Sequence, residues 1–571
     1  ARVDYAPPRA RGLAVRVEGN LARLRAAVAP DYALDNTAAG TWNAGTAVGY
    51  ASDDLDLGVG YRVMRARGGI CTCLRTSTPE EFERAVRRAR PADADLYRAD
   101  FAIDRAKQEI WHHLAYARAR VHLGRAGELH ALYAFQFNDR REYDVVRQSV
   151  EGPQLVFGLA THSADLRLEH ARVDLRDGAL VGTLGAAFAH QANDFRAASP
   201  LIPDYRQQTW AVYDVERLVR DRLEIELGAR YEGLRRHAQL GEHDYLGQLA
   251  GGRLDPDACR ASGDGGACEH AFHTASATLG ALTQPSARVP ALTWRLQLDT
   301  SARVPAIDEH FMNGAAPSFP LLGLGSSRLG VERAWGGETT LHYDGDWIMA
   351  EGTAYASLID DYIYFIPQRQ EGQCAPLSCT ARGPLPVFVF TPTDALFGGG
   401  ELRLSLRAPR LPLGLVGNAA WVRAQDLHAG APLALVPADR YTLAGRYFIP
   451  DGRRHARAYL EVSGTAVARQ RRTQPALDFA DPPPAYVLLG AAAGVEFLTE
   501  PHVLRLSLVG TNLLNARYRD YTSLLRYFAD EPGWGVQLRL SADFDVDLPR
   551  RPAERAAARR PPGRPRALPA L

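Results

Sequence analysis

Six cysteines carry the clearest chemistry of this 571-residue sequence, and they form three close pairs: Cys71 with Cys73, Cys259 with Cys268, and Cys374 with Cys379. Close, even-numbered pairs are typical of proteins that fold in an oxidising compartment. The second pair flanks a glycine-rich segment and the third flanks only APLS, so we predict a disulfide in each. For the first pair we make no prediction, because a bond between residues two apart would close a strained ring. Zinc is the alternative, although the sequence contains no CxxC pair.

Other patterns give no prediction of catalysis. The sequence contains no GxSxG, HExxH or Walker motif. His112 and His113 are adjacent, and neighbouring strand residues point to opposite faces, so the two cannot bind one ion from a regular strand. We therefore predict a protein that is not an enzyme, without catalytic residues, metal ligands or cofactor. The net charge of +1 gives no argument for nucleic-acid binding.

An aromatic group, Tyr362, Tyr364 and Phe365, could stack on an aromatic ligand. Aromatic residues at a membrane interface give the same pattern, and the sequence leaves both interpretations open.

The elements that must position these residues are strands. In 501–544, Leu504, Leu506 and Leu508 alternate with polar residues, and Val536, Leu538 and Leu540 do so after a loop. Such period-two alternation predicts strands with one apolar and one charged face. The apolar face belongs either to the core of a soluble β protein or, in a membrane barrel, to the lipid.

The alternation recurs along the chain and gives about twenty strands. Around residues 223–232, four charged residues share one face, which indicates a wet lumen. We expect these apolar residues to face outward: Leu223, Ile225, Leu227, Leu402, Leu404, Leu406, Leu538 and Leu540. Connections alternate between short and long, as in outer-membrane barrels. One long connection contains Thr78-Pro79-Glu80-Glu81, which predicts a short helix from Pro79 to about Ala89. No apolar run reaches the roughly 18 residues of a spanning helix.

Several segments resemble TonB-dependent outer-membrane receptors, in matching order along about 530 residues. They are LIPDYRQQTWAVYDVERLVRDRLEIELGARYE (201–232), SARVPAIDEHFMNG (301–314), LGVERAWGGETTLHYDGD (329–346), DDYIYFIP (360–367) and NLLNARYRDY (512–521). The resemblance implies an all-β fold, a large antiparallel transmembrane β-barrel of about 20–22 strands with long extracellular loops. It also implies a place in the outer membrane of a Gram-negative bacterium.

The sequence departs from the family pattern at both ends. We expect no plug and no TonB-binding box, and the first strand resembles the third of the family, so the opening strands are expected to be missing. We predict a barrel over residues 1–545 and a disordered, Arg- and Pro-rich tail over 546–571.

By resemblance, the protein would take up a scarce nutrient such as a ferric siderophore or another metal complex. Its partners would be outer-membrane lipid, a small-molecule ligand and the TonB complex, the last through a plug not present in this chain. The candidate ligand-binding residues are Tyr362, Tyr364, Arg303 and His310. The expected absence of a plug leaves a passive outer-membrane pore as the alternative, and a barrel-borne adhesin or enzyme as a third possibility.

Overall fold

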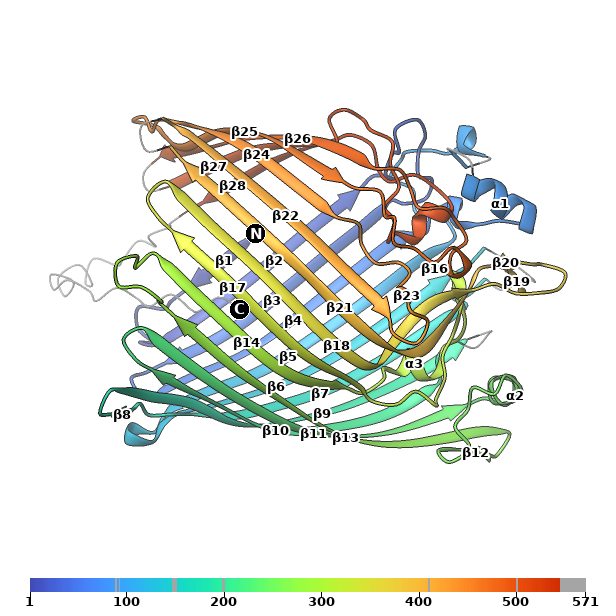
Figure 1. Ribbon diagram of the computed structural model, residues 1–571, viewed down its shortest axis with the longest axis horizontal. Helices are drawn as coiled ribbons and strands as arrows, with labels where there is room; N and C mark the ends of the chain where they lie inside the picture. Colours follow the sequence, from blue (N-terminus) through green and yellow to red (C-terminus); the bar gives the residue numbers. More distant parts are fainter. Residues whose placement is uncertain are drawn as a thin grey trace.

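The computed structural model describes residues 1–544, apart from 88–89, 92, 146–150, 198–200, 381, 409–410 and 500–501. Within this part, one large sheet curls into a barrel (Figure 1). The sheet holds 26 strands, six of them short, which leaves twenty long strands, in agreement with the predicted number. The predicted tail, residues 546–571, lies outside the described residues.

The long strands follow one another around the wall, and each pairs antiparallel with the next. They are β2 (Leu13–Leu24), β3 (Ala39–Ala51), β4 (Leu55–Gly69), β5 (Lys107–His122), β6 (Gly127–Tyr143), β7 (Leu155–His170), β9 (Gly178–Ala197), β10 (Asp204–Val219), β11 (Leu223–Leu240), β13 (Gly265–Thr283), β14 (Leu292–Arg303), β17 (Glu332–Asp344), β18 (Ile348–Gln368), β21 (Val387–Arg407), β22 (Leu413–Asp426), β24 (Arg440–Ile449), β25 (His455–Val467), β26 (Tyr486–Thr499), β27 (His502–Thr511) and β28 (Gly535–Asp543).

The shorter elements lie mainly in the connections. The six short strands of the sheet are β1 (Arg2–Tyr5), β8 (Val173–Leu175), β12 (Cys259–Ser262), β15 (Asn313–Ala316), β16 (Phe319–Leu324) and β23 (Ala431–Pro432). A separate hairpin joins β19 (Ser378–Thr380) to β20 (Gly383–Leu385). The helices are α1 (Pro79–Arg87), α2 (Glu242–Ala250) and α3 (Ile307–Phe311), and α1 confirms the helix predicted to begin at Pro79. Strands β16 and β21 make a short parallel contact.

Short turns gather at one end of the barrel and long connections at the other (Figure 1). Residues 345–347 join β17 to β18, for example, whereas 304–331 join β14 to β17. Within the described residues, β1 pairs only with β2, and β28 only with β27. Strands β1 and β28 both run toward the short-turn end, so a direct pairing between them would be parallel.

The long strands place apolar side chains on the outer face and charged ones in the lumen. The predicted outward residues Leu402 and Leu538 are 53% and 67% exposed, and their strand neighbours lie on the other face. The lumen face carries ion pairs, among them Arg217–Glu226 (2.5 Å) and Arg446–Glu461 (2.6 Å). An apolar outer wall with a polar lumen is the arrangement of a transmembrane barrel.

The dry core of the protein lies at the end with the long connections. We call this region the canopy: the described residues of 25–38, 70–106, 241–258, 304–331, 369–386, 427–439, 468–485 and 512–534. Its largest fully buried side chains include Phe82, Phe311, Tyr527 and Phe528. Phe82 of α1 packs edge-on against Phe528, with ring centroids 5.8 Å apart, although the two are far apart in the sequence. The connections therefore fold together into a packed layer over the barrel.

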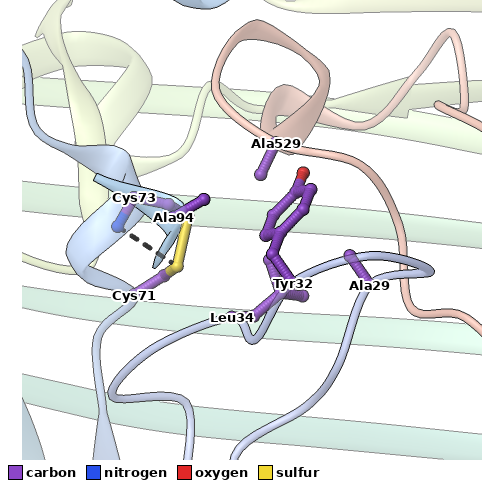
Figure 2. Close-up of a cluster of buried hydrophobic side chains, with 7 residues drawn as sticks. All are labelled: Ala29, Tyr32, Leu34, Cys71, Cys73, Ala94 and Ala529. Carbon is purple, nitrogen blue, oxygen red and sulfur yellow. Dashed lines mark hydrogen bonds between the residues drawn. A yellow bond between two sulfur atoms is a disulfide. The ribbon is translucent and has the colours of Figure 1, made fainter. Parts of the chain in front are cut away.

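The canopy and the adjoining strand ends contain three disulfides. Cys259–Cys268 joins β12 to β13, and Cys374–Cys379 joins a turn to β19 within one connection, as predicted. Cys71 and Cys73, left open by the sequence, are also bonded. They pack with Tyr32, Leu34 and Ala529 in one buried cluster (Figure 2). Among the described residues, no helix is long and apolar enough to cross a membrane.

Candidate functional site

A pocket of about 380 Å³ lies where the strand wall meets the canopy. Its walls come from β18, β21, β22, β24, β25 and β26, from the connections that precede β24 and β26, and from the connection between β27 and β28. Tyr355, Glu401 and Arg440 contribute side chains from the strands, and Asp520 and Thr522 close the pocket from the connection. The alternation of each strand turns Glu401 and Arg440 to the lumen, because Leu402 and Tyr441 beside them face outward.

Asp520 organises the polar side of this pocket. Its carboxylate accepts hydrogen bonds from the Tyr486 hydroxyl (2.9 Å), the Arg440 guanidinium (3.2 Å) and the Thr522 hydroxyl (2.7 Å). Burial opposes the charge, but the hydrogen bonds from Thr522 and Tyr486 and the nearby Arg440 hold the pKa of Asp520 below its ordinary value. Asp520 is therefore an anion at neutral pH, and it fixes one cationic and one aromatic side chain at the pocket surface.

The connection that carries Asp520 is fixed by a second set of buried polar groups. Arg526 donates to both carboxylate oxygens of Asp478 (2.7 and 2.6 Å), and the Tyr527 hydroxyl donates to the same carboxylate (2.8 Å). Both members of this ion pair are almost completely buried. Arg519 in turn donates to Asp530 (2.9 Å). The pocket floor is thus held in place by the canopy and not by the strands alone.

None of the four predicted ligand-binding residues lines this pocket. Arg303 ends β14 and donates to Glu309 (2.7 Å) and Glu332 (2.9 Å). Tyr362 of β18 lies edge-on to Phe397 at 5.2 Å. The Arg303 side chain is 43% exposed, and Tyr362 is half-buried.

The other two predicted residues are buried in the canopy and at its junction with β18. His310 is fully buried; its Nδ1 accepts from Arg236 (3.1 Å), and its Nε2 lies 3.1 Å from the Leu329 carbonyl. Burial, together with the Arg236 charge, lowers the pKa of His310 to about 3, so the ring is neutral and its Nε2–H donates. The buried Tyr364 hydroxyl accepts from the Ala434 backbone N–H (2.7 Å). The role of all four residues in ligand binding stays a prediction.

The sequence analysis missed Arg440, Tyr486 and Asp520 as site residues. Asp520 lies in the NLLNARYRDY segment, which was noted as a motif without a role. Arg440 belongs to a lumen-facing row of charges that resembles every other such row in the sequence. Their meeting depends on the register of the consecutive strands β24, β25 and β26, which places Arg440, Val467 and Tyr486 in one row. It also depends on how the connection after β27 folds over that row, and a single sequence carries no signal for either.

One group of possible metal ligands occurs among the described residues. Glu128 and His130 of β6 and Glu169 of β7 present their ligand atoms within 4.8 Å of one another, toward the short-turn end of the lumen. The carboxylates are also approached by Arg120 (3.7 Å) and Arg167 (3.4 Å). This arrangement is that of an ion-paired lumen wall, since two cations share the same oxygens.

The family described as TonB dependent receptor-like, beta-barrel matches residues 27–513. The copper transporter OprC is a similar solved structure, with a TM-score of 0.67 at 14% identity over 93% of this chain and 76% of that one. The FrpB iron transporter from Neisseria meningitidis (F3-3 variant) has a TM-score of 0.63 at 14% identity, over 93% of this chain and 77% of that one. The siderophore receptor PirA from Acinetobacter baumannii has a TM-score of 0.63 at 14% identity, over 95% of this chain and 76% of that one. No curated protein matches the sequence. At these identities the solved structures show the fold alone.

Proposed function

The chain belongs to the TonB-dependent receptors, which are outer-membrane proteins of Gram-negative bacteria, and we propose that it takes up a metal complex, such as a ferric siderophore, from outside the cell. Family membership places the short turns on the periplasmic side and the canopy outside. The pocket between canopy and lumen then lies on the path of an entering ligand.

The observation that carries this proposal is the chemistry of that pocket. Arg440 and Tyr486 are held at its surface by Asp520, and Tyr355 and Tyr521 add aromatic surface. A guanidinium beside tyrosine rings suits a ligand with anionic oxygen groups on an aromatic or apolar frame. Proteins of similar structure are named for copper, iron and siderophore uptake, which supports a metal complex as the cargo.

We propose that transport is driven by the TonB complex acting through a plug in the lumen. The described residues include the wall and the canopy but no plug. We therefore treat ligand capture, which the canopy and lumen perform, as the function to test on this chain, separately from energy coupling.

Binding of a panel of ferric siderophores and copper complexes to the purified chain tests the proposal. For a complex that binds, we expect Arg440→Gln with Tyr486→Phe to weaken binding at least tenfold. The matched control is Arg446→Gln, a lumen-facing arginine of the same strand that pairs with Glu461 outside the pocket; it should bind normally. A panel without any binder, or equal binding by both variants, would contradict the proposal. Steady ion conductance in planar bilayers without ligand would favour a passive pore instead.

A further inference from the structure

A group of cations lies on the outer face of the barrel at the canopy end of three neighbouring strands. They are Arg65 and Arg67 of β4, Lys107 of β5 and Arg141 of β6. The strand register places them in adjacent rows: Arg65 lies between Trp42 and Trp111, and Arg67 lies in line with Glu109 and Arg141. We call these four residues the outer cation cluster.

These side chains point outward and not into the lumen. Leu57, Val59 and Tyr61 of β4 are exposed apolar residues on the outer face. Residues two apart on a strand share a face, so Arg65 and Arg67 continue the same row. The direct pairing of Arg65 with Trp111, and of Arg67 with Glu109, carries this face across to β5.

The cluster lies at the level of lipid headgroups. A strand tilted by about 40° rises by about 2.5 Å per residue along the membrane normal, and the apolar band of such a barrel is about 25 Å tall. The band therefore spans about ten residues, from Leu57 to about Arg67. Trp42 and Trp111 mark the same level, because indoles concentrate at the membrane interface; their rings meet edge-on at 5.6 Å.

The protein neutralises only part of this charge. Glu109 lies 3.2 Å from Arg67 and 2.9 Å from Lys107, and Asp139 lies 2.7 Å from Arg141. Arg65 has no carboxylate partner among the described residues; its guanidinium lies 5.1 Å from the centre of the Trp111 ring. Four cations against two carboxylates leave two positive charges at a surface that faces lipid headgroups.

We propose that the outer cation cluster binds the phosphate groups of an acylated, doubly phosphorylated lipid in the outer leaflet. Guanidinium groups bind phosphate oxygens in a bidentate manner, and the two uncompensated charges match two phosphates. Below the cluster, Tyr61, His113 and Phe137 form an aromatic strip along the same face, with the Tyr61 hydroxyl and His113 Nδ1 2.7 Å apart. This strip contacts the acyl chains of the lipid.

The site lies outside the barrel wall and does not depend on the proposed transport function. It goes beyond general contact with lipid, because it assigns one headgroup chemistry to one part of the circumference. Arg423 of β22 offers a matched control. The alternation of side chains along β22 places it on the outer face, and both its terminal nitrogens already donate to Asp439 (2.6 and 2.9 Å).

Native mass spectrometry of the full chain in neutral detergent tests this proposal. The probes are bisphosphorylated lipid A, the same lipid after enzymatic dephosphorylation, and phosphatidylglycerol. We expect lipid A to bind with one predominant stoichiometry, phosphatidylglycerol to bind more weakly, and the dephosphorylated lipid to bind at least tenfold more weakly than lipid A. Arg65→Gln with Arg141→Gln should reduce lipid A binding at least tenfold, whereas Arg423→Gln should leave it unchanged.

Thermal unfolding without added lipid shows whether each variant is folded. If the double variant unfolds early, Arg65→Gln alone replaces it, because Arg65 has no ion pair to lose; a threefold or greater loss of binding is then expected. Equal binding of the phosphorylated and dephosphorylated lipids, or equal losses in the cluster variant and Arg423→Gln, would overturn the proposal.

Discussion

The barrel wall and the canopy of this receptor follow opposite folding rules. In the wall, apolar side chains such as Leu538 and Leu540 point outward, and charged ones line a wet lumen. In the canopy, aromatic side chains such as Phe82 and Tyr527 are sealed inside, as in a soluble protein. The wall is held by strand pairing and by lipid; the canopy is held by packing, buried polar groups and disulfides.

Ion pairs show what the difference means in energy. Arg526 and Asp478 in the canopy are almost completely buried, whereas Arg217 and Glu226 in the lumen are 50% and 35% exposed. Breaking a buried pair leaves an uncompensated charge out of water, while water replaces the lost partner of an exposed pair. Breaking a pair between an arginine and a carboxylate is therefore expected to cost more stability in the canopy than in the lumen.

The largest expected effect comes from breaking the buried pair. Arg526→Met leaves Asp478 charged and buried, so we expect the canopy to lose about 3–5 kcal/mol. Hydrogen exchange of residues 512–534 measures this loss, and strands such as β4 should keep their protection. Arg217→Met in the lumen should cost at most about 1 kcal/mol. Equal effects of the two variants would remove the distinction between wall and canopy.

A charge on the outer face should have the next largest effect. Leu402 lies about five residues above the short-turn end of β21, near the middle of the apolar band, and Leu402→Arg should cost about 2–4 kcal/mol in lipid. Ser405→Arg, on the lumen face of the same strand, should change stability by no more than about 0.5 kcal/mol. Folding titrations in lipid bilayers measure both values. If Ser405→Arg proved as costly, the assignment of the two faces would be wrong.

The wall could be predicted from sequence. In the canopy, local features such as the helix at Pro79 and the Cys374–Cys379 disulfide could also be predicted, but the packing between its connections could not. Alternation at Leu402 and Leu538 is local, so it predicts both the strands and their outward faces. The contact of Arg526 with Asp478, and of Phe82 with Phe528, joins residues from separate connections, and no local pattern specifies it. The sequence likewise placed His310 in a ligand site without any sign that the canopy buries it. The pocket is lined by residues of both the wall and the canopy, so the sequence pointed only to the motif that contains Asp520.

Acid should weaken the canopy through His310. Its pKa of about 3 lies below the ordinary value near 6.5, so the unfolded canopy binds a proton that the folded canopy does not. Stability is therefore complete above about pH 6.5 and falls as the pH drops from there toward 3, by about 2 kcal/mol between pH 7 and pH 5. Hydrogen exchange of the canopy over this range measures the fall. His310→Gln cannot titrate, so its stability should depend less on pH; an unchanged acid dependence would show that other groups cause it.

The smallest expected effect on the wall is that of reducing the disulfides. Cys71–Cys73 and Cys374–Cys379 each bridge residues within one connection, and Cys259–Cys268 ties β12 to the canopy end of β13. A bond that closes a short local loop restricts that loop, and it leaves the pairing of the long strands untouched. After reduction, we expect faster hydrogen exchange in the connections, whereas the unfolding free energy of the wall should change by no more than about 0.5 kcal/mol. Thiol labelling of the unreduced, unfolded protein should find no reactive cysteine, because all six are bonded. A large loss of wall stability on reduction would mean that the canopy supports the barrel, and that the two regions do not fold by separate rules.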